Sequence, residues 1–485
     1  MNSLPTRKAN PTRIERDLLG EREVPASAYY GVHTLRAVEN FDISGTPISI
    51  YPDLVNAMAC VKKAAALANH DLGLLDTERT NAIVAACDEI RAGALHDQFI
   101  VDVIQGGAGT STNMNANEVI ANRALELMGK ERGNYDVLHP NEHLNLSQST
   151  NDVVPTALKI ASWFAIYRLI DAMEVLRLAF EAKAAEFKDL LKVGRTQLQD
   201  AVPMTLGQEF SAYAVTLAED MERLREVTHL ICEINMGATA IGTGITAHPE
   251  YAELVCKHLS QITGIPFVTA PNLVEATQDA GVFVQMSGVL KRVAVKLSKI
   301  CNDLRLLSSG PRAGLGEINL PPMQAGSSIM PGKVNPVIPE VVNQIAFEVI
   351  GNDVTVSFAA EAGQLQLNAF LPIVAHSIFK SLTHLHNGCL TLAKRCVGGI
   401  AANRERLQEL MNRSIVLVTA LNPYIGYANA TEIAQEALRT GRSVADLVLE
   451  KKLVTSEKLS EILRPESLTQ PVRPFNISSA SKRSA

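Results

Sequence analysis

The spacing of proline restricts the fold of this chain more than any other feature of its sequence. The middle of the chain contains five long intervals without an internal proline, which run from Pro155 to Pro203, Pro203 to Pro249, Pro271 to Pro311, Pro339 to Pro372, and Pro372 to Pro423. Proline disrupts the hydrogen bonding of a helix interior, so intervals of this length permit unusually long helices.

Apolar residues recur at steps of three or four in two of these intervals. The first contains Leu169, Met173, Leu176, Phe180, Ala184, Phe187 and Leu191, and Gly194 predicts a helix end just past Lys192. The third contains Met286, Val289, Val293, Leu297, Ile300 and Leu304, and Gly310 with Pro311 predicts its end. Helices of this length cannot bury their apolar stripes against short neighbours, so a bundle of long, nearly parallel helices is predicted.

We therefore predict a mainly all-α chain of three domains. A length of 485 residues is too great for one ordinary hydrophobic core. The expected parts are an N-terminal helical domain (1–148), a central bundle of long helices (149–404) and a small C-terminal helical domain with a mobile tail (405–485). The few strand-like runs, such as Ser414 to Val418, are too short to build a sheet.

Charge and cysteine content narrow the class of protein. A net charge of -6 and the lack of a long Lys/Arg stripe argue against a nucleic-acid partner. The seven cysteines are widely spread and favour a reducing cytoplasm. The basic N-terminal residues precede no apolar core, and no stretch elsewhere looks long and apolar enough to span a bilayer. We therefore expect a cytoplasmic protein without a membrane partner.

A first polar cluster, GGAGTSTNMNANE, runs from Gly106 to Glu118. Its glycines allow close backbone approach, and its hydroxyls and amides are donors that can surround a carboxylate. A phosphate-binding loop is the rival interpretation. It is disfavoured because no Gly-Lys-Ser/Thr follows and no strand is predicted before it.

A second cluster, HPNEHLNLSQSTND, runs from His139 to Asp152, directly before the first long helix. Its Ser149, Thr150 and Asn151 are placed where a helix N-terminus presents free N–H groups, which suits an anion. Ordinary helix capping would account for the same residues, and both interpretations stay open here. The two histidines of the cluster lack further ligands, which argues against zinc.

A third cluster, GSSIMPGKVNP, runs from Gly326 to Pro336. Glycine and proline are interleaved with two serines, a lysine and an asparagine, a composition that predicts a mobile loop able to close over a ligand. A surface turn would explain the glycines and prolines. It would not explain a lysine and an asparagine two residues apart beside paired serines.

The third cluster resembles the signature loop of the fumarase/aspartase superfamily, and the other two clusters match its remaining conserved regions. The similarity extends from about Ile14 to about Leu463. Within the superfamily the chain looks most like the bacterial aspartases (aspartate ammonia-lyases), through the segments Glu21–Phe41, Gly194–Phe210, Cys301–Pro321 and Ala359–Asn368. Fumarases usually carry His where this chain has Gln197, and this difference favours the aspartases.

The resemblance implies reversible elimination of ammonia from L-aspartate to fumarate through an aci-carboxylate intermediate. It assigns the general base to Ser327, with Lys333 as the positive charge nearby. The β-carboxylate is expected to contact Thr110, Ser149, Thr150 and Ser328, and the α-carboxylate Lys333, Asn335 and Thr196. Asn151, with Gln197, is expected to orient the leaving amino group, and the donor of its proton stays open.

The resemblance also implies a homotetramer with a core of long helices, in which each active site takes its three clusters from three different chains. No organic cofactor is expected, because elimination needs neither hydride transfer nor an electron sink. Magnesium activates some related enzymes, although no ligand set for it stands out in this sequence. Two alternatives stay open: a fumarate hydratase of the same superfamily, and a catalytically silent structural homologue.

Overall fold

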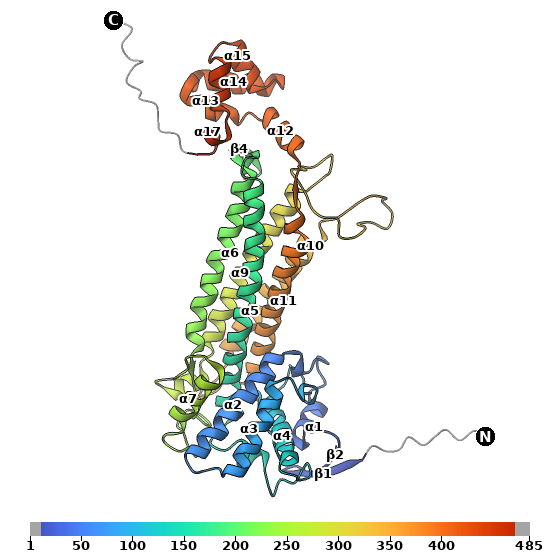
Figure 1. The fold of residues 1–485 in the computed structure, drawn as a ribbon, viewed down its shortest axis with the longest axis vertical. Helices are drawn as coiled ribbons and strands as arrows, with labels where there is room; N and C mark the ends of the chain where they lie inside the picture. The colour runs from blue at the N-terminus through green and yellow to red at the C-terminus, as the bar shows by residue number, and fades with distance from the viewer. Residues whose placement is uncertain (1–10, 471–485) are drawn as a thin grey trace, which may run out of the picture. The chain divides into compact units, whose positions relative to one another are not determined.

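The computed structural model describes residues 11–470 of the chain, and these residues are mainly helical (Figure 1). Within this part of the chain, strands occur only as four two-stranded sheets. The predicted all-α class is therefore confirmed. The expected mobile tail, the Ser-rich end of the chain, lies within residues 471–485, which are outside the described part.

The helices and strands follow one another in a regular order along the chain. The N-terminal elements are β1 (Thr12–Asp17), β2 (Gly20–Pro25), α1 (Val32–Asn40), α2 (Pro52–Asp71), α3 (Thr77–Arg91), α4 (Thr110–Leu127) and the π-helical turn η3 (Pro140–Leu144). The central elements are α5 (Thr150–Glu186), β3 (Leu191–Thr196), β4 (Gln199–Thr205), α6 (Leu206–Ile231), β5 (Glu233–Ile234), α7 (Tyr251–Thr263), β6 (Val268–Thr269), α8 (Leu273–Gln278), α9 (Gly281–Leu307), β7 (Ile318–Asn319), α10 (Val337–Glu361) and α11 (Leu371–Arg395). The C-terminal elements are β8 (Ala401–Ala402), α12 (Arg404–Arg413), α13 (Leu417–Ile425), α14 (Tyr427–Thr440), α15 (Val444–Glu450), α16 (Ser456–Ile462) and α17 (Pro465–Leu468).

The long proline-free intervals do contain long helices. Helix α9 covers the whole of the second predicted stripe and ends before Gly310, as expected. Helix α5 ends at Glu186, so the predicted end near Gly194 is wrong. Leu191 begins strand β3 instead, because a single apolar residue after a helix can continue a helical period by coincidence.

The chain contains two β-hairpins that were not predicted from the sequence. Strands β1 and β2 pair antiparallel, as do β3 and β4, and each pair forms a hairpin of its own. The run Ser414 to Val418 is not a strand, because α13 begins inside it at Leu417. The prediction that strands form no extended sheet is confirmed, since each sheet has two strands in the described residues.

The described chain divides into two compact units. Unit 1 holds the residues up to Asp171 together with Asp220–Ala294 and Ile345–His386, and unit 2 holds the remainder. Each boundary falls inside one of the five longest described helices, so each of those helices contributes a part to both units. The division into three domains at 148/149 and 404/405 stays a prediction.

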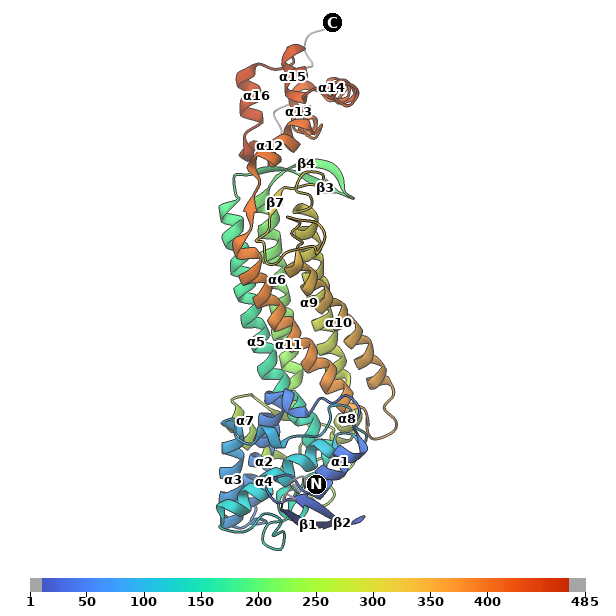
Figure 2. The same ribbon diagram turned by 90° about the vertical axis from the view of Figure 1, so that its right-hand side faces the viewer.

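Within unit 1, parts of α6, α9 and α10 pack side by side and carry polar contacts between their apolar stripes (Figures 1 and 2). Asp353 of α10 accepts hydrogen bonds from the Ser287 hydroxyl at 2.9 Å and from Lys291 Nζ at 2.6 Å, both on α9. Arg292 of α9 donates to Asp220 of α6 at 2.8 Å. These contacts fix the register between neighbouring helices.

Within unit 2, aromatic residues fill the space between α5 and α6. Phe210 packs edge-to-face against Phe187, with ring centroids 5.3 Å apart, and lies close to Phe180 at 6.0 Å. The Tyr213 hydroxyl donates to Asp303 of α9 at 3.0 Å, so a polar contact joins this aromatic group to the next helix. Helices α12 to α17 of the same unit enclose a separate apolar cluster to which β3 contributes Val193.

Helix α5 also corrects the expectation about apolar stretches. By length and composition alone it could cross a membrane, which the sequence analysis did not recognise. However, 72% of its most apolar window is buried inside the protein. Burial of this extent is typical of the core helix of a helical bundle, which accounts for its apolar composition.

Candidate active site

The first polar cluster forms the turn that leads into helix α4. Gly107, Ala108 and Gly109 all have positive φ, at 88°, 57° and 93°, and Thr110 is the first helical residue. The Thr110 hydroxyl donates to Gly107 O at 2.7 Å, which tightens the turn, while the residue itself is exposed. The cluster therefore presents a hydroxyl at a helix N-terminus, a position that was not predicted for it from the sequence.

Close packing against α5 fixes this turn in place. A Cβ atom added at Gly109 would lie only 2.9 Å from Val154 Cγ1, so glycine is required there both for its φ and for space. The first cluster thus packs against Val154 of α5, two residues past the end of the second cluster.

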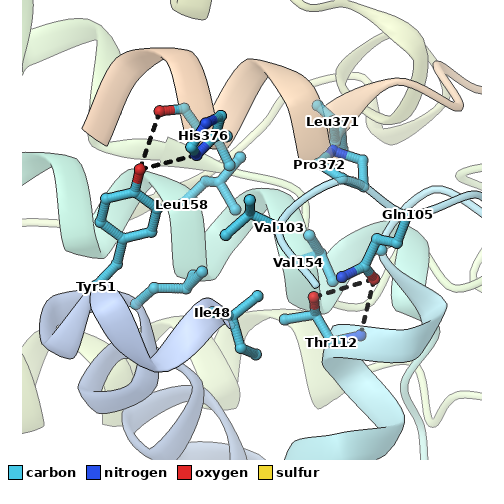
Figure 3. A pocket seen from close by; sticks show the side chains of 13 residues that line it. Ile48, Tyr51, Val103, Gln105, Thr112, Val154, Leu158, Leu371, Pro372 and His376 are labelled. Carbon is cyan, nitrogen blue, oxygen red and sulfur yellow. Dashed lines mark hydrogen bonds between the residues drawn. The ribbon is translucent and has the colours of Figure 1, made fainter. Parts of the chain in front are cut away.

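A small pocket lies beneath the first cluster (Figure 3). Its volume of about 20 Å³ has room for a single water-sized sphere, and its walls are mainly apolar, with Val103, Val154, Leu158 and Leu371 among them. On one side the Tyr51 hydroxyl lies 2.8 Å from His376 Nδ1. On the other, Gln105 Oε1 accepts from the backbone N–H and the hydroxyl of Thr112, at 3.1 and 3.2 Å. The pocket is too small for a dicarboxylate and belongs to the packing that supports α4.

The second cluster forms the start of helix α5. The helix begins at Thr150, so Ser149, Thr150 and Asn151 occupy a helix N-terminus, as predicted. Buried Asp152 accepts hydrogen bonds from Ser149 N and Thr239 N, both at 3.0 Å. Burial raises the pKa of Asp152 to about 7, although these backbone donors act against that rise. Asn151 Nδ2 donates to Ala240 O at 2.7 Å, which holds that side chain in place.

Hydrogen bonds join the first two clusters within unit 1. Asn113 Nδ2, on the first cluster, donates to Thr150 Oγ1 at 3.2 Å and to Asn145 Oδ1 at 3.1 Å, both in the second. The first and second clusters therefore adjoin within one chain, which argues against the expectation that they reach a site from different chains. The number of chains that build a site stays a prediction. The argument from rigid helices fails for this pair, because α4 packs directly against the beginning of α5.

The third cluster is an irregular loop in unit 2 that ends where α10 begins. The Ser327 hydroxyl oxygen accepts hydrogen bonds from Met330 N at 2.9 Å and from Ile329 N at 3.2 Å. Two N–H donors on one serine oxygen lower the free energy of its alkoxide form, and a serine that acts as a base needs this support. Ser328 and Lys333 are exposed on the same loop.

The ends of this loop are tied together. Gly326 N donates to Lys333 O at 2.8 Å, and Asn335 Nδ2 donates to Gly326 O at 2.7 Å. A Cβ atom at Gly326 would lie 2.7 Å from Lys333 O, so this crossing depends on glycine. The Asn335 amide, predicted to contact substrate, thus also closes the loop.

The β3–β4 hairpin carries Thr196 and Gln197 in unit 2. Its two-residue turn consists of Gln197 and Leu198, with φ of 53° and 63°, a conformation that residues other than glycine and asparagine adopt at a cost of about 1–3 kcal/mol. Arg195, next to Thr196, pairs with fully buried Glu317 at 2.5 Å. A cleft of about 290 Å³ opens beside the hairpin and includes Gln197 in its wall.

The structure thus sorts the predicted site residues into two sets. Unit 1 contains Thr110, Ser149, Thr150 and Asn151. Unit 2 contains Thr196, Gln197, Ser327, Ser328, Lys333 and Asn335. Each set combines hydroxyl and amide groups, but only the second includes a cation among the predicted residues.

Two buried lysines near these sets were not predicted from the sequence. Buried Lys62 of α2 donates to Asn145 Oδ1 at 3.0 Å, and Lys192 of β3 pairs with Glu317 at 2.9 Å. Lys62 and Lys192 each follow a short apolar run, Ala57–Val61 and Leu190–Leu191, and a lysine directly after such a run is the signal that could have drawn attention to them. For a metal, residues 11–470 contain no group of three or more His, Cys, Asp or Glu side chains placed to hold an ion.

The long helices, polar clusters and serine loop belong to a chain that matches the models of a helical lyase family. The family model described as Lyase matches residues 20–351, and the model of the fumarase C C-terminus matches residues 417–470.

Three curated relatives are each named aspartate ammonia-lyase. The relative from Pseudomonas aeruginosa is 59% identical over 95% of this chain and 97% of its own length. The relative from Helicobacter pylori is 57% identical over 95% of this chain and 98% of its own length. The relative from Escherichia coli is 56% identical over 96% of this chain and 97% of its own length. The chain belongs to the aspartate ammonia-lyase family of the fumarase/aspartase superfamily.

Solved structures agree with this family in fold. A crystal structure described as fumarate lyase:delta crystallin from Brucella melitensis, bound to cobalt, has a TM-score of 0.93 at 56% identity, over 95% of this chain and all of that chain. A class II fumarase from Schistosoma mansoni has a TM-score of 0.88 at 35% identity, over 94% and 98%. The fold is thus shared by enzymes with different names in one superfamily.

Gly109→Ala should lower the stability of unit 1 by about 2–4 kcal/mol, because the new methyl group meets Val154 and the backbone keeps a positive φ. Gly129→Ala is the matched control, since Gly129 also has a positive φ but nothing within 4 Å of an added Cβ. Melting temperatures of the two variants give the comparison. An equal decrease in both would show that the contact with Val154 has no energetic weight.

Proposed function

We propose that this chain is an aspartate ammonia-lyase, which reversibly eliminates ammonia from L-aspartate to give fumarate. The observation that carries this proposal is the Ser327 hydroxyl oxygen, which accepts two backbone N–H donors inside the intact serine loop. Three relatives of this name, each 56–59% identical over nearly the whole chain, support the choice of substrate.

Ser327 acts as the general base in this proposal. The C3 proton of aspartate is weakly acidic, so its removal needs a strong base and stabilisation of the aci-carboxylate that forms. A free serine is a poor base, but the N–H groups of Ile329 and Met330 lower the cost of its alkoxide. Lys333 supplies positive charge on the same loop.

Residues of both sets contact the substrate in this proposal. In the proposal Thr110, Ser149, Thr150 and Ser328 donate to the β-carboxylate, where charge develops, and each such donor is worth roughly 3 kcal/mol. The α-carboxylate is held by Lys333, Asn335 and Thr196. Asn151 and Gln197 orient the leaving amino group. No organic cofactor takes part in this elimination.

We further propose a cytoplasmic homotetramer. Large apolar side chains remain exposed on α5 and α10, among them Phe164, Tyr167, Phe347, Val354 and Phe358, with Phe347 at 62% and Phe358 at 70%. Phe347, Val354 and Phe358 follow one another at helical spacing, so they form one stripe that a second copy of the chain would cover.

The direct test is an absorbance assay for fumarate formed from L-aspartate, with L-malate as the parallel substrate. The proposal expects fumarate from aspartate and essentially none from malate. Fumarate from malate alone would identify a fumarate hydratase. No fumarate from either substrate would identify a catalytically silent homologue.

Ser327→Ala should lower kcat at least a thousandfold, because it removes the base, while the fold and the binding of fumarate are retained. The measurement is steady-state kinetics together with calorimetric titration of fumarate. A variant that keeps more than a tenth of the wild-type kcat would exclude Ser327 as the base.

Lys333→Met should raise KM for aspartate by a factor of about ten to a hundred, because it removes a charge partner of the α-carboxylate. Lys257→Met on α7 is the control, since Lys257 is exposed and lies in unit 1 outside both sets. Initial rates over a range of aspartate concentrations give both KM values. An unchanged KM for Lys333→Met would remove this residue from the binding role.

Subunit mixing should reveal how the sets combine. We expect an equimolar mixture of Thr150→Ala and Ser327→Ala, unfolded and refolded together, to recover about a quarter of wild-type activity by random assortment. The quarter arises because each site draws an intact Thr150 and an intact Ser327 with a chance of one-half each.

The control mixture combines Thr150→Ala with Thr110→Ala, two lesions that lie in the same unit of one chain. It should recover nothing, since every site would still carry one lesion. No recovery in the first mixture would mean that each site is built within a single chain.

A further inference from the structure

Lys62 is a buried lysine that the proposed reaction does not use. It lies in the middle of α2 with 0% of its surface exposed. Its Nζ donates to Asn145 Oδ1 at 3.0 Å and to Gln148 Oε1 at 2.9 Å. Its hydrogen-bond partners are thus neutral side-chain amides of the second cluster.

The positive charge of Lys62 is not balanced by an ion pair. Across residues 11–470, no carboxylate lies within ion-pair distance of its Nζ. Lys192, which is also buried, pairs with both Glu209 and Glu317, at 2.5 and 2.9 Å. A buried charge without an ion pair is costly, and the buried carboxylate of Asp152, which acts on Lys62 from a longer distance, offsets only part of that cost. A lysine in this position therefore suggests that an anion supplies further negative charge.

A chain of hydrogen bonds leads from Lys62 to the predicted carboxylate site. Asn145 Oδ1 accepts from Lys62, from Asn113 at 3.1 Å and from Asn117 at 3.2 Å. Asn113 also donates to Thr150 Oγ1 at 3.2 Å. Lys62 therefore orients the Asn145 amide. Asn145 in turn orients the Asn113 amide, which donates to the Thr150 hydroxyl.

The charged groups around Lys62 make its protonation depend on whether an anion is bound at Thr150. Burial lowers the pKa of Lys62 to about 7, while Asp152 and the thiol of Cys87 act to raise it. Asp152 lies two residues after Thr150, where its own negative charge would repel a substrate carboxylate. An anion bound at Thr150 would keep the proton on Lys62, and the ammonium would offset both negative charges.

We infer that Lys62 is the positioning residue that supplies positive charge to the carboxylate site of unit 1, acting through Asn145 and Asn113 on Thr150. This inference rests on the proposed function, since the anion is the β-carboxylate of aspartate or fumarate. The charge should matter more in the transition state than in the ground state, because the aci-carboxylate carries one more negative charge than the carboxylate from which it forms.

Two variants test the inference in the full-length protein. Lys62→Met removes the charge and keeps most of the side-chain volume. Asn145→Asp keeps an acceptor for Lys62 and places a carboxylate 3.0 Å from its Nζ, so it neutralises the charge without emptying the site. Lys159→Met is the matched control, because Lys159 is also a buried lysine. It lies on α5, nine residues after Thr150, and donates to the backbone oxygen of Glu233 instead of to the second cluster.

The measurements are the Kd of fumarate by calorimetry, kcat and KM for aspartate, and the melting temperature. We expect Lys62→Met and Asn145→Asp to raise the Kd of fumarate at least tenfold and to lower kcat/KM at least a hundredfold. Their melting temperatures should stay at or above that of the wild type, because an unpaired buried charge is removed or paired. Lys159→Met should leave the Kd and kcat/KM within a factor of three.

The opposite results are equally clear. Wild-type Kd and kcat/KM in a folded Asn145→Asp variant would overturn the inference and leave the proposed function intact. An unchanged Kd of fumarate would also overturn it, even with a lower kcat, since the charge of Lys62 would then have no effect on a bound carboxylate. If the wild type neither binds fumarate nor forms it from aspartate, the proposed function fails first and the inference fails with it.

Discussion

The hydrogen bond from Asn113 to Thr150 is the contact on which the site in unit 1 depends. It joins the first turn of α4 to the first turn of α5, and so places two helix N-termini next to one another. Each N-terminus carries the partial positive charge of its helix dipole, and together they favour an anion more than either does alone. The contact needs α4 to approach α5 closely, and Gly109 permits this because Val154 occupies the space where a side chain would lie. The polar chemistry of the site therefore depends on a steric requirement.

The sequence predicts the parts of this protein whose cause is local. Helix α9 is visible in the spacing of its apolar residues, and the serine loop in its interleaved glycine and proline. The β3–β4 hairpin escapes prediction because its turn uses Gln197 and Leu198 at positive φ, where glycine or asparagine is the usual signal. The burial of Lys62 could not be predicted from the sequence, for another reason. A lysine in an alanine-rich helix is usually solvated, and only the packing of other elements around α2 buries it.

The two units differ in how they treat buried charge. In unit 2 the carboxylate of Glu317 is fully buried between Lys192 and Arg195, so its charge is neutralised within the protein. These ion pairs fix the geometry of the hairpin that carries Thr196. Because their charges offset one another, they contribute little electrostatic attraction for a ligand. The exposed Lys333 provides the field there instead. In unit 1 the cation is buried and the hydroxyl groups are accessible, which is the reverse arrangement.

This contrast suggests why the buried amides of unit 1 are incompletely paired. The side-chain oxygens of Asn113 and Asn117 are buried and have no hydrogen-bond partner within the described residues. Each unpaired oxygen costs about 1–3 kcal/mol of folding free energy. Both amides instead direct an N–H group to Asn145 Oδ1, the atom that also receives Lys62. Turning either amide around would withdraw a donor from this atom and place a second oxygen against it, which would be repulsive. The network thus gives up part of its stability to hold every N–H and the positive charge in one orientation, and that orientation is useful only when an anion is present.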